Sequence, residues 1–276
     1  MIALVTGASS GIGKDIAREL AKRNYDIIAI ARNEEGLKEV KIELEQKYHV
    51  KVDIRSMDLI DRDGCRKLYE DVQKQYGTIE ILVNNAGFGT CGEFTKTDLD
   101  KELGMIDTNI AALHILTKLF LRDMVKENKG HILNVASIAG FMPGPLMATY
   151  YSTKAYVVRL TQSIRQELFM KKSKVKISCL CPGPVKTNFN KVADVKFNLL
   201  EADSQKVAKC AVNRMFRNRI LIFPGVFVWI GRLLAKISPD QISAFFAILH
   251  KKEKFNSVAK GTHVALGTLV STTSVP

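Results

Sequence analysis

The first 180 residues predict a single doubly wound α/β fold, in which a parallel sheet is flanked by helices on both faces. Two observations support this prediction. Short apolar runs alternate there with segments of helical periodicity, and this order is typical of a parallel sheet. Some runs, such as residues 27–30, are apolar at every position, as in strands that are buried on both sides. With 276 residues, of which 46% are apolar, the chain is long enough for one domain with a sizeable core.

The apolar runs predict seven strands, and the segments between them predict at least five helices. The strands are expected at residues 2–6, 26–31, 50–56, 79–84, 131–137, 175–181 and 220–223. The helices are expected at residues 12–23, 34–47, 62–76, 111–126 and 150–171.

The carboxyl-terminal part differs from this alternation. Residues 220–231 contain no charged side chain, and Pro224-Gly225 separates the last strand from an apolar helix. This run is too short for a membrane span, which needs about 20 residues. We interpret 220–255 as a carboxyl-terminal apolar helical extension that serves as a lid, an oligomer interface or a peripheral membrane contact through 220–250. Residues 1–255 are then expected to form one domain, and 256–276 are expected to form a disordered tail.

The charge balance is strongly basic, with 41 basic and 28 acidic residues and a formal net charge of +13. Such a surface attracts nucleic acid, anionic lipid or phosphate-bearing ligands. The sequence has no basic stripe interleaved with aromatic residues and no nucleic-acid-binding motif, so a nucleic-acid partner is not expected. Solvated helix faces and a phosphate-bearing ligand remain as interpretations.

The five cysteines are scattered and do not have the spacing of a metal site or a disulfide framework. Buried thiols in a reducing compartment are the plain interpretation, and no metal is expected. Because the first strand starts at Ile2, no signal peptide is expected either. The predicted location is cytoplasmic, with membrane association as the alternative.

A glycine-rich turn follows the first strand and opens the first helix. Glycines allow a tight turn there and let the backbone approach a pyrophosphate, while the helix start offers unpaired N–H groups and positive potential. Strand, turn and helix come in the order that a dinucleotide site requires. The turn therefore predicts nucleotide binding by Gly7, Ser9, Ser10, Gly11, Ile12 and Gly13.

The end of the second strand bears on the choice of cofactor. Sites specific for NAD usually place an acid there to hold the ribose 2′-hydroxyl. This chain has Ala31 followed by Arg32, and an arginine can bind a 2′-phosphate through charge-assisted hydrogen bonds. The sequence therefore favours NADP(H) over NAD(H), with Arg32 as a surface residue paired to Glu34 or Glu35 as the alternative.

A phenol and an ammonium lie four residues apart in the predicted helix that starts at Tyr150. Tyr150 and Lys154 share one helix face, and a neighbouring positive charge is expected to lower the pKa of the phenol. Ser137 lies thirteen residues upstream and can supply a hydroxyl to the oxygen that changes charge. Since both residues of the pair are common on helices, the spacing alone is weak evidence.

Taken together, the glycine turn, residues 84–87 (Asn-Asn-Ala-Gly), Ser137 and the Tyr150-x-x-x-Lys154 pair resemble the short-chain dehydrogenase/reductase family over about residues 1–220. The resemblance implies a Rossmann fold and an oxidoreductase that uses NAD(P). It implies catalytic roles for Asn109, Ser137, Tyr150 and Lys154. It also implies that the cofactor contacts Asp58, Leu59, Asn85, Ala86, Gly87, Tyr150, Lys154, Pro182, Gly183, Val185 and Thr187.

The mechanism that the resemblance implies is interconversion of a carbonyl and an alcohol. Tyr150 donates the proton, Ser137 stabilises the developing oxyanion, and Lys154 lowers the pKa of the phenol and holds the nicotinamide ribose. Asn109 links Lys154 to solvent through a water molecule. Tyr151 is the rival phenol, but it points about 100° away around the helix and is expected to pack or line the pocket.

The substrate is expected to be a lipophilic small molecule, such as a fatty acyl, steroid-like or bulky carbonyl compound. This expectation depends on apolar residues lining one cleft, with ordinary packing as the alternative. The residues are Phe141, Met142, Pro143, Leu146, Met147, Phe189, Phe197, Phe227 and Trp229. The alternatives in function are an NAD-dependent dehydrogenase and a non-catalytic NADP-binding sensor or scaffold. A homodimer or homotetramer is expected.

Overall fold

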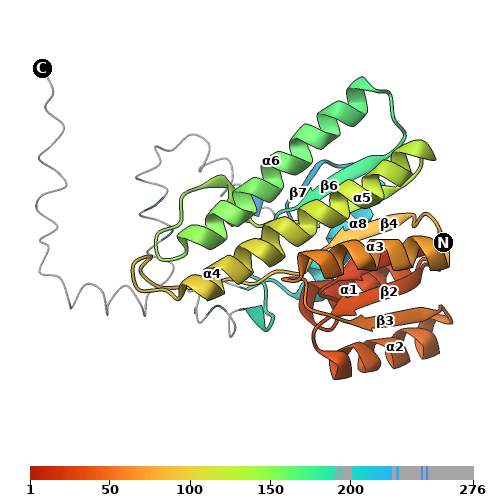
Figure 1. The fold of residues 1–276 in the computed structure, drawn as a ribbon, viewed down its shortest axis with the longest axis horizontal. Helices are drawn as coiled ribbons and strands as arrows, with labels where there is room; N and C mark the ends of the chain where they lie inside the picture. The colour runs from red at the N-terminus through yellow and green to blue at the C-terminus, as the bar shows by residue number, and fades with distance from the viewer. Residues whose placement is uncertain (190–192, 194–200, 226–227, 230–243, 245–246, 248–276) are drawn as a thin grey trace, which may run out of the picture.

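The computed structural model describes residues 1–189, 193, 201–225, 228, 229, 244 and 247. Its centre is a seven-stranded sheet in the order β3-β2-β1-β4-β5-β6-β7 (Figure 1). Each neighbouring pair of strands is parallel. The predicted doubly wound α/β fold is confirmed.

All seven predicted strands are present, and several are shorter than predicted. They are β1 (Ile2–Thr6), β2 (Asp26–Ala31), β3 (Val52–Ser56), β4 (Ile81–Asn84), β5 (His131–Val135), β6 (Lys176–Leu180) and β7 (Leu221–Ile222). Strand β5 ends before Ser137 because the hydroxyl of Ser137 accepts the N–H of Ala139 and so starts a helical turn. Strand β3 starts late because the N–H of Lys51 is bound to the Asp26 carboxylate.

The five helices predicted within residues 1–180 are present, and the described part of the chain has four more helical segments. The helices there are α1 (Gly11–Ala21), α2 (Glu34–Tyr48), α3 (Arg62–Tyr76), α4 (Leu99–Ile106), η1 (Asp107–Ala112), α5 (Leu113–Lys126), η2 (Ile138–Phe141), α6 (Ala148–Met170) and α8 (Ser204–Phe216). Of these, α4, η1, η2 and α8 were not predicted from the sequence. The start of α8 could have been predicted from the sequence, because Asp203 is a typical capping residue and apolar residues follow it at helical spacing.

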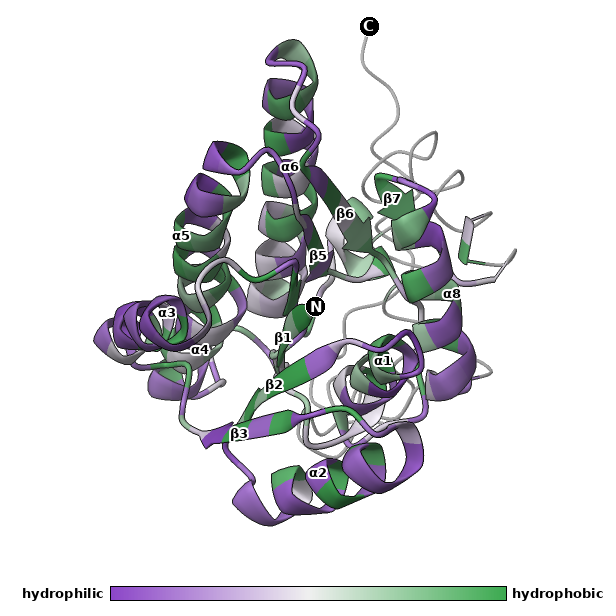
Figure 2. Ribbon diagram, turned by 90° about the vertical axis from the view of Figure 1, so that its right-hand side faces the viewer, coloured by the Kyte–Doolittle hydropathy of each residue, from purple (hydrophilic) through white to green (hydrophobic). Residues whose placement is uncertain are grey.

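Two apolar layers cover the faces of the sheet (Figure 2). Helices α1, α2 and α8 pack on one face around side chains such as Ile16, Leu37 and Val212. Helices α3, α5 and α6 pack on the other face around side chains such as Leu68 and Phe120. Both faces of the central strands are therefore covered, as their uniformly apolar sequences require.

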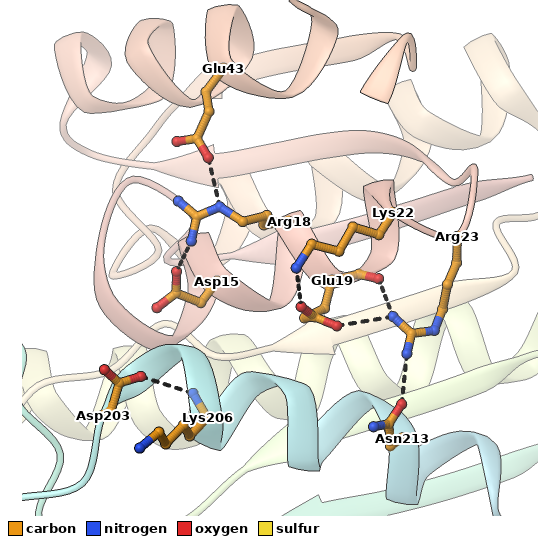
Figure 3. A network of polar contacts seen from close by, with 9 residues as sticks. All are labelled: Asp15, Arg18, Glu19, Lys22, Arg23, Glu43, Asp203, Lys206 and Asn213. Carbon is orange, nitrogen blue, oxygen red and sulfur yellow. Dashed lines mark hydrogen bonds and ion pairs between the residues drawn. The ribbon is translucent and has the colours of Figure 1, made fainter. Parts of the chain in front are cut away.

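Polar contacts fix α1 to the two helices beside it (Figure 3). Arg18 of α1 bonds both to Asp15 of the same helix and to Glu43 of α2, the latter at 2.6 Å. Arg23, which follows α1, donates to Asn213 of α8 at 2.6 Å. Because the glycine turn opens α1, these contacts hold the turn in place relative to the rest of that face.

Strand β7 leads into the predicted apolar extension, most of which lies outside the described residues. Phe223 is buried and stacks against Phe141 with ring centroids 5.6 Å apart. The predicted helix after Gly225 and the tail at 256–276 fall on residues that the structure does not describe, apart from a few positions. None of the helices in the described part is long and apolar enough to cross a bilayer.

Replacing Phe120 with alanine is expected to destabilise the fold strongly. Phe120 is fully buried in α5 and meets the ring of Tyr69 edge-on, with centroids 5.1 Å apart. The cavity left by Phe120→Ala costs about 3–5 kcal/mol of unfolding free energy, measured by urea denaturation. Phe169→Ala is the matched control, since that side chain is 72% exposed on α6 and its loss costs less than about 0.5 kcal/mol. Equal effects of the two variants contradict the assigned core.

Candidate active site

Three of the predicted catalytic side chains meet at the carboxyl edge of the sheet. Ser137 follows β5 and caps η2, while Tyr150 and Lys154 lie in the first turns of α6. The Ser137 hydroxyl is hydrogen-bonded to the Tyr150 phenol. The Lys154 ammonium lies 5.8 Å from the centre of the Tyr150 ring. The order of strands and helices thus brings residues from two separate segments to one point.

The structure contradicts the predicted lowering of the Tyr150 pKa by Lys154. Burial raises the pKa of this phenol well above its usual value, and the hydrogen bond from Ser137 offsets only part of that effect. Lys154 does not bind the phenol oxygen; its ammonium donates to the backbone carbonyl of Val135 at 3.0 Å. Burial also lowers the pKa of Lys154 to about 8. Desolvation therefore outweighs the charge effect that the spacing alone suggested.

Ser137 is held by the backbone on both sides. Its hydroxyl accepts the N–H of Ala139 at 3.2 Å and lies 3.4 Å from the carbonyl of Pro182, to which it can donate. Pro182 also accepts the N–H of Ile138 at 2.8 Å, so β5 and β6 end side by side. This arrangement fixes the serine hydroxyl next to the tyrosine with little freedom to move.

Asn109 lies near the predicted catalytic group, and both N–H groups of its amide are already engaged. The side chain exchanges two hydrogen bonds with the backbone of Phe88, at 3.1 and 3.0 Å, and donates to the hydroxyl of Thr153 at 3.1 Å. Asn109 is buried within η1, a π-helical turn between α4 and α5. The amide thus ties α6 and the loop after β4 to the π-helical turn.

Two of these partners, Phe88 and Thr153, were not predicted from the sequence. The Thr153 hydroxyl accepts from Asn109 and donates to the carbonyl of Tyr150 at 2.7 Å. The position of Thr153 directly before Lys154 is the sequence feature that could have identified it as a residue of the site. Phe88 contributes only backbone atoms, so no side-chain pattern could have identified it.

The loop after β4 passes close to both Asn109 and Lys154. A Cβ atom on Gly87 would lie 2.7 Å from the Asn109 Oδ1 and 3.3 Å from the Lys154 ammonium, so a side chain does not fit there. Asn85 and Ala86 donate their backbone N–H groups to the Thr6 hydroxyl at 2.9 and 3.0 Å. The predicted residues 85–87 therefore join the glycine turn to the catalytic group.

The glycine turn has the geometry that a pyrophosphate site needs. Gly7 and Gly11 have φ angles of 65° and 55°, which glycine adopts without strain. A Cβ on Gly13 would lie 2.2 Å from the Gly7 carbonyl oxygen. Ser10 precedes α1 without a side-chain cap, whereas Asn33, Asp61, Asp98 and Asp203 cap α2, α3, α4 and α8. The first N–H groups of α1, including those of Ile12 and Gly13, thus remain open to an anion.

Arg32 and Asp58 form the predicted adenosine end of the site. The guanidinium of Arg32 lies 3.4 Å from the Asp58 carboxylate, and both side chains are exposed. Arg32 is a surface residue, as the predicted alternative has it, but its partner is Asp58, whereas Glu34 and Glu35 pair with Lys38. Leu59 is buried, and Ser9 packs against Gly36 at the start of α2. The exposed guanidinium is thus available to an anionic ligand.

The segment after β6 closes the other side of the glycine turn. A Cβ on Gly11 would lie 3.0 Å from the Thr187 methyl group, so Thr187 faces the turn directly. Val185 pairs with Ala202 in an isolated parallel bridge, and a Cβ on Gly183 would lie 3.2 Å from a methyl group of Val228. The structure therefore places this predicted segment beside the turn.

Tyr151 takes a packing position, as predicted. A Cβ on Gly144 would lie within 2.3 Å of three atoms of the Tyr151 ring, so this ring lies flat against the Gly144 backbone. Burial raises its pKa to about 12, and the Cys91 thiol nearby adds to the shift. The Tyr151 ring is 6.1 Å from that of Tyr150.

An apolar cluster surrounds the catalytic tyrosine. Phe189 packs on Tyr150 with ring centroids 5.2 Å apart. The cluster also contains Phe88, Cys91, Met105, Ala139, Leu146, Met147, Tyr151 and Ala193. Of the predicted pocket residues, Leu146, Met147 and Phe189 belong to it, whereas Phe141 packs in a different cluster. Phe197 and Phe227 lie outside the described residues, and Trp229 is 48% exposed.

Among the described residues, no group of three or more His, Cys, Asp or Glu side chains could hold a metal ion.

Comparison with known proteins gives one family. Residues 1–196 match the family model for short chain dehydrogenases. The chain is 34% identical to an uncharacterized oxidoreductase of Staphylococcus epidermidis, over 70% of this chain and 81% of that protein. It is 31% identical to human 17-beta-hydroxysteroid dehydrogenase 13, over 88% and 81%. It is also 36% identical to the NADP-dependent 3-hydroxy acid dehydrogenase of Schizosaccharomyces pombe, over 68% and 73%.

Among solved structures with the same fold, one contains NADPH and another contains NAD. A short-chain dehydrogenase from Sphingobium yanoikuyae in complex with NADPH has a TM-score of 0.77 at 27% identity, covering 82% of this chain and 88% of that one. A short-chain dehydrogenase/reductase from Burkholderia phymatum in complex with NAD has a TM-score of 0.77 at 22% identity, covering 84% and 92%. Both proteins share the fold of this chain.

Lys154 is expected to make the stability of the protein rise with pH. Because its pKa is about 8 in the folded chain and 10.5 without the fold, the unfolded state binds more protons between these values. Stability therefore increases as pH rises through this window. Between about pH 7.5 and 9.5, the unfolding free energy of the wild type is expected to rise by about 2 kcal/mol relative to that of Lys154→Met, as measured by urea unfolding.

The comparison with the variant cancels the other groups that titrate in this range, such as Cys65, whose pKa burial raises to about 11. A difference between the two proteins that stays constant with pH contradicts the burial of the charge.

Proposed function

The chain belongs to the short-chain dehydrogenase/reductase family of oxidoreductases, which act on CH–OH groups, and we propose that it uses NADP(H) to interconvert a lipophilic carbonyl compound and its alcohol. The observation that carries this proposal is the buried group of Ser137, Tyr150 and Lys154 beside an uncapped glycine turn. A binding protein without catalysis needs the turn, but it has no need for a buried phenol and ammonium. When bound, a nicotinamide dinucleotide supplies the hydride for the carbonyl carbon.

Tyr150 is the proton donor in this proposal. Burial raises the pKa of its phenol, so the proton stays on the oxygen at neutral pH and is available to a substrate oxygen that becomes negative. The Ser137 hydroxyl, fixed by the backbone of Ala139 and Pro182, donates to the same substrate oxygen. Because the phenol is protonated before the reaction, it is ready to donate a proton, as the reductase direction requires.

Lys154 supplies positive charge behind the tyrosine. Its ammonium is desolvated and has one described hydrogen-bond acceptor, the carbonyl of Val135, which leaves two of its three protons for the cofactor ribose or a water molecule. As the phenol loses its proton, this charge offsets part of the cost that burial places on the phenolate.

Asn109 belongs to the proton relay as a positioning residue. Both of its N–H groups are taken by Phe88 and Thr153, so a water beside Lys154 can donate to the remaining lone pair of Asn109 Oδ1 or to the backbone carbonyls of the π-helical turn. A π-helical turn leaves carbonyls out of the regular hydrogen-bond ladder, and such turns are frequent at functional sites.

The preference for NADP(H) rests on Arg32. Its exposed guanidinium lies where the ribose 2′-phosphate is expected, and no acid occupies that position of the second strand. Asp58 holds the guanidinium loosely, at 3.4 Å, and a phosphate with two charges competes well with one carboxylate. The NADP dependence of the Schizosaccharomyces pombe relative supports the same choice.

The lipophilic substrate is supported by the cluster around Tyr150. Phe88, Met147 and Phe189 present apolar surface beside the reacting group. The relative named 17-beta-hydroxysteroid dehydrogenase 13 supports a bulky lipophilic substrate. A homodimer or homotetramer, a cytoplasmic location and peripheral membrane contact through 220–250 stay predictions.

Tyr150→Phe is expected to lower kcat/KM by about 10²- to 10⁴-fold, because it removes the proton donor while keeping the ring. The measurement is NADPH oxidation across a panel of hydrophobic ketones, aldehydes and acyl thioesters. Tyr151→Phe is the matched control, one residue along the same helix, and is expected to stay within about threefold of wild type. Full activity of Tyr150→Phe would refute the proposed acid.

Arg32→Asp is expected to lower kcat/KM for NADPH by roughly tenfold or more while leaving the value for NADH unchanged or higher, because the new acid repels the 2′-phosphate and can bind the 2′-hydroxyl. Arg66→Asp is the control, since Arg66 is also an exposed arginine paired with an aspartate, Asp63. The cofactor assignment fails if the NADPH/NADH ratio of Arg32→Asp equals that of Arg66→Asp.

A further inference from the structure

A small closed chamber lies near the catalytic tyrosine, and the proposed mechanism does not use it. It has a volume of about 20 Å³, enough for one water-sized group. The loop after β4 and α4 form one side, and the segment that leads into α6 forms the other. We call it the distal chamber; it is lined by Thr90, Gly92, Phe94, Thr97, Glu102, Leu146, Met147, Ala148 and Thr149.

The wall of the distal chamber contains a buried carboxylate with spare acceptor capacity. Glu102 is 8% exposed, and its Oε1 accepts the hydroxyl of Thr97 at 2.7 Å. Glu102 lines the chamber, and because a carboxylate can accept about four hydrogen bonds, it can accept more than the one from Thr97. The chamber is therefore suited to a group that donates hydrogen bonds.

The two walls of the chamber are held together by the backbone. The carbonyl of Leu146 accepts the N–H of Gly92 at 2.8 Å. Leu146 itself has a φ of 65°, which is uncommon for a residue with a branched side chain and has to be maintained by its surroundings. The chamber is thus formed by the fold and does not depend on a ligand to shape it.

One side chain, that of Met147, lies between the distal chamber and the catalytic tyrosine. Met147 lines the chamber, and its terminal methyl group reaches toward Gly89 from the same side as the Tyr150 ring. A Cβ on Gly89 would lie 3.4 Å from the Met147 Cε, 3.3 Å from the Tyr150 Cδ2 and 2.9 Å from the Phe189 ring. Methionine is unbranched and adapts its shape easily, so its side chain can turn aside without a backbone change.

We propose that the distal chamber is a substrate subsite for a hydrogen-bond donor, a hydroxyl or a primary ammonium, at the end of the substrate away from the reacting carbonyl. This inference rests on the proposed function. The apolar body of the substrate lies against Phe88 and Phe189, the Met147 side chain turns aside, and the donor binds Glu102. A carboxylate at that end is excluded, because it would face the Glu102 charge in a buried site.

The test compares ketones that differ only at the far end, which carries a methyl, hydroxyl, ammonium or carboxylate group, over several chain lengths. In the wild type, the best hydroxyl or ammonium compound is expected to exceed its methyl counterpart in kcat/KM by roughly tenfold to a hundredfold, with the carboxylate the poorest. Glu102→Gln keeps an acceptor for Thr97 but loses the charge, and is expected to reduce the preference to within about threefold.

Glu93→Gln is the matched control, because Glu93 is on the same loop but pairs with Lys96 outside the chamber, and it should keep the wild-type preference. Thr90→Val removes a chamber hydroxyl with almost no change in shape and should weaken the preference if Glu102→Gln does not fold. A methyl compound that equals the donors, or a Glu102→Gln variant that slows all ketones alike, overturns the subsite and leaves the proposed function intact. Failure to reduce any ketone refutes the proposed function, and the subsite with it.

Discussion

The burial of the Lys154 ammonium is the constraint on which the rest of the site depends. A buried positive charge is tolerated only where acceptors replace the water it has lost. Here the described acceptor is the carbonyl of Val135, the last residue of β5, at 3.0 Å. The first turns of α6 must therefore lie directly against the end of that strand. That position also brings Tyr150, four residues earlier on the same face of the helix, to the hydroxyl of Ser137.

Close backbone approaches maintain this arrangement. A Cβ on Gly140 would lie 2.7 Å from the carbonyl oxygen of Lys154, so η2 can pack on α6 only because this residue is a glycine. Gly87 has the same role on the other side of the lysine, next to Asn109. Thr153 completes the connection by bonding to both Asn109 and the carbonyl of Tyr150. The catalytic group is thus fixed by segments from β4, η1, η2 and α6, which are far apart in the sequence.

Much of the fold and of the site could be predicted from the sequence. The features that could not be predicted were missed for one physical reason. The alternation of apolar runs and helical periods predicts the parallel sheet, because strands buried on both faces have a distinctive composition. The glycine turn is equally readable, since the positive φ of Gly7 and Gly11 needs that residue type. The π-helical turn at Asp107–Ala112 and the contacts of Asn109 with Phe88 are not readable, because they depend on backbone hydrogen bonds between distant segments.

The predicted lowering of the Tyr150 pKa failed for the same reason, because burial also depends on segments that are distant in the sequence. Spacing along a helix reports which side chains are neighbours, but not how far water is excluded from them. Exclusion of water raises the pKa of Tyr150 and lowers that of Lys154, so the phenol keeps its proton while the ammonium is held less firmly than in water. Proton transfer from the phenol then creates an anion beside the ammonium in a site with few other charges. Coulomb attraction to the ammonium lessens the cost of forming that phenolate, but the raised pKa of Tyr150 means that the cost of desolvation is larger.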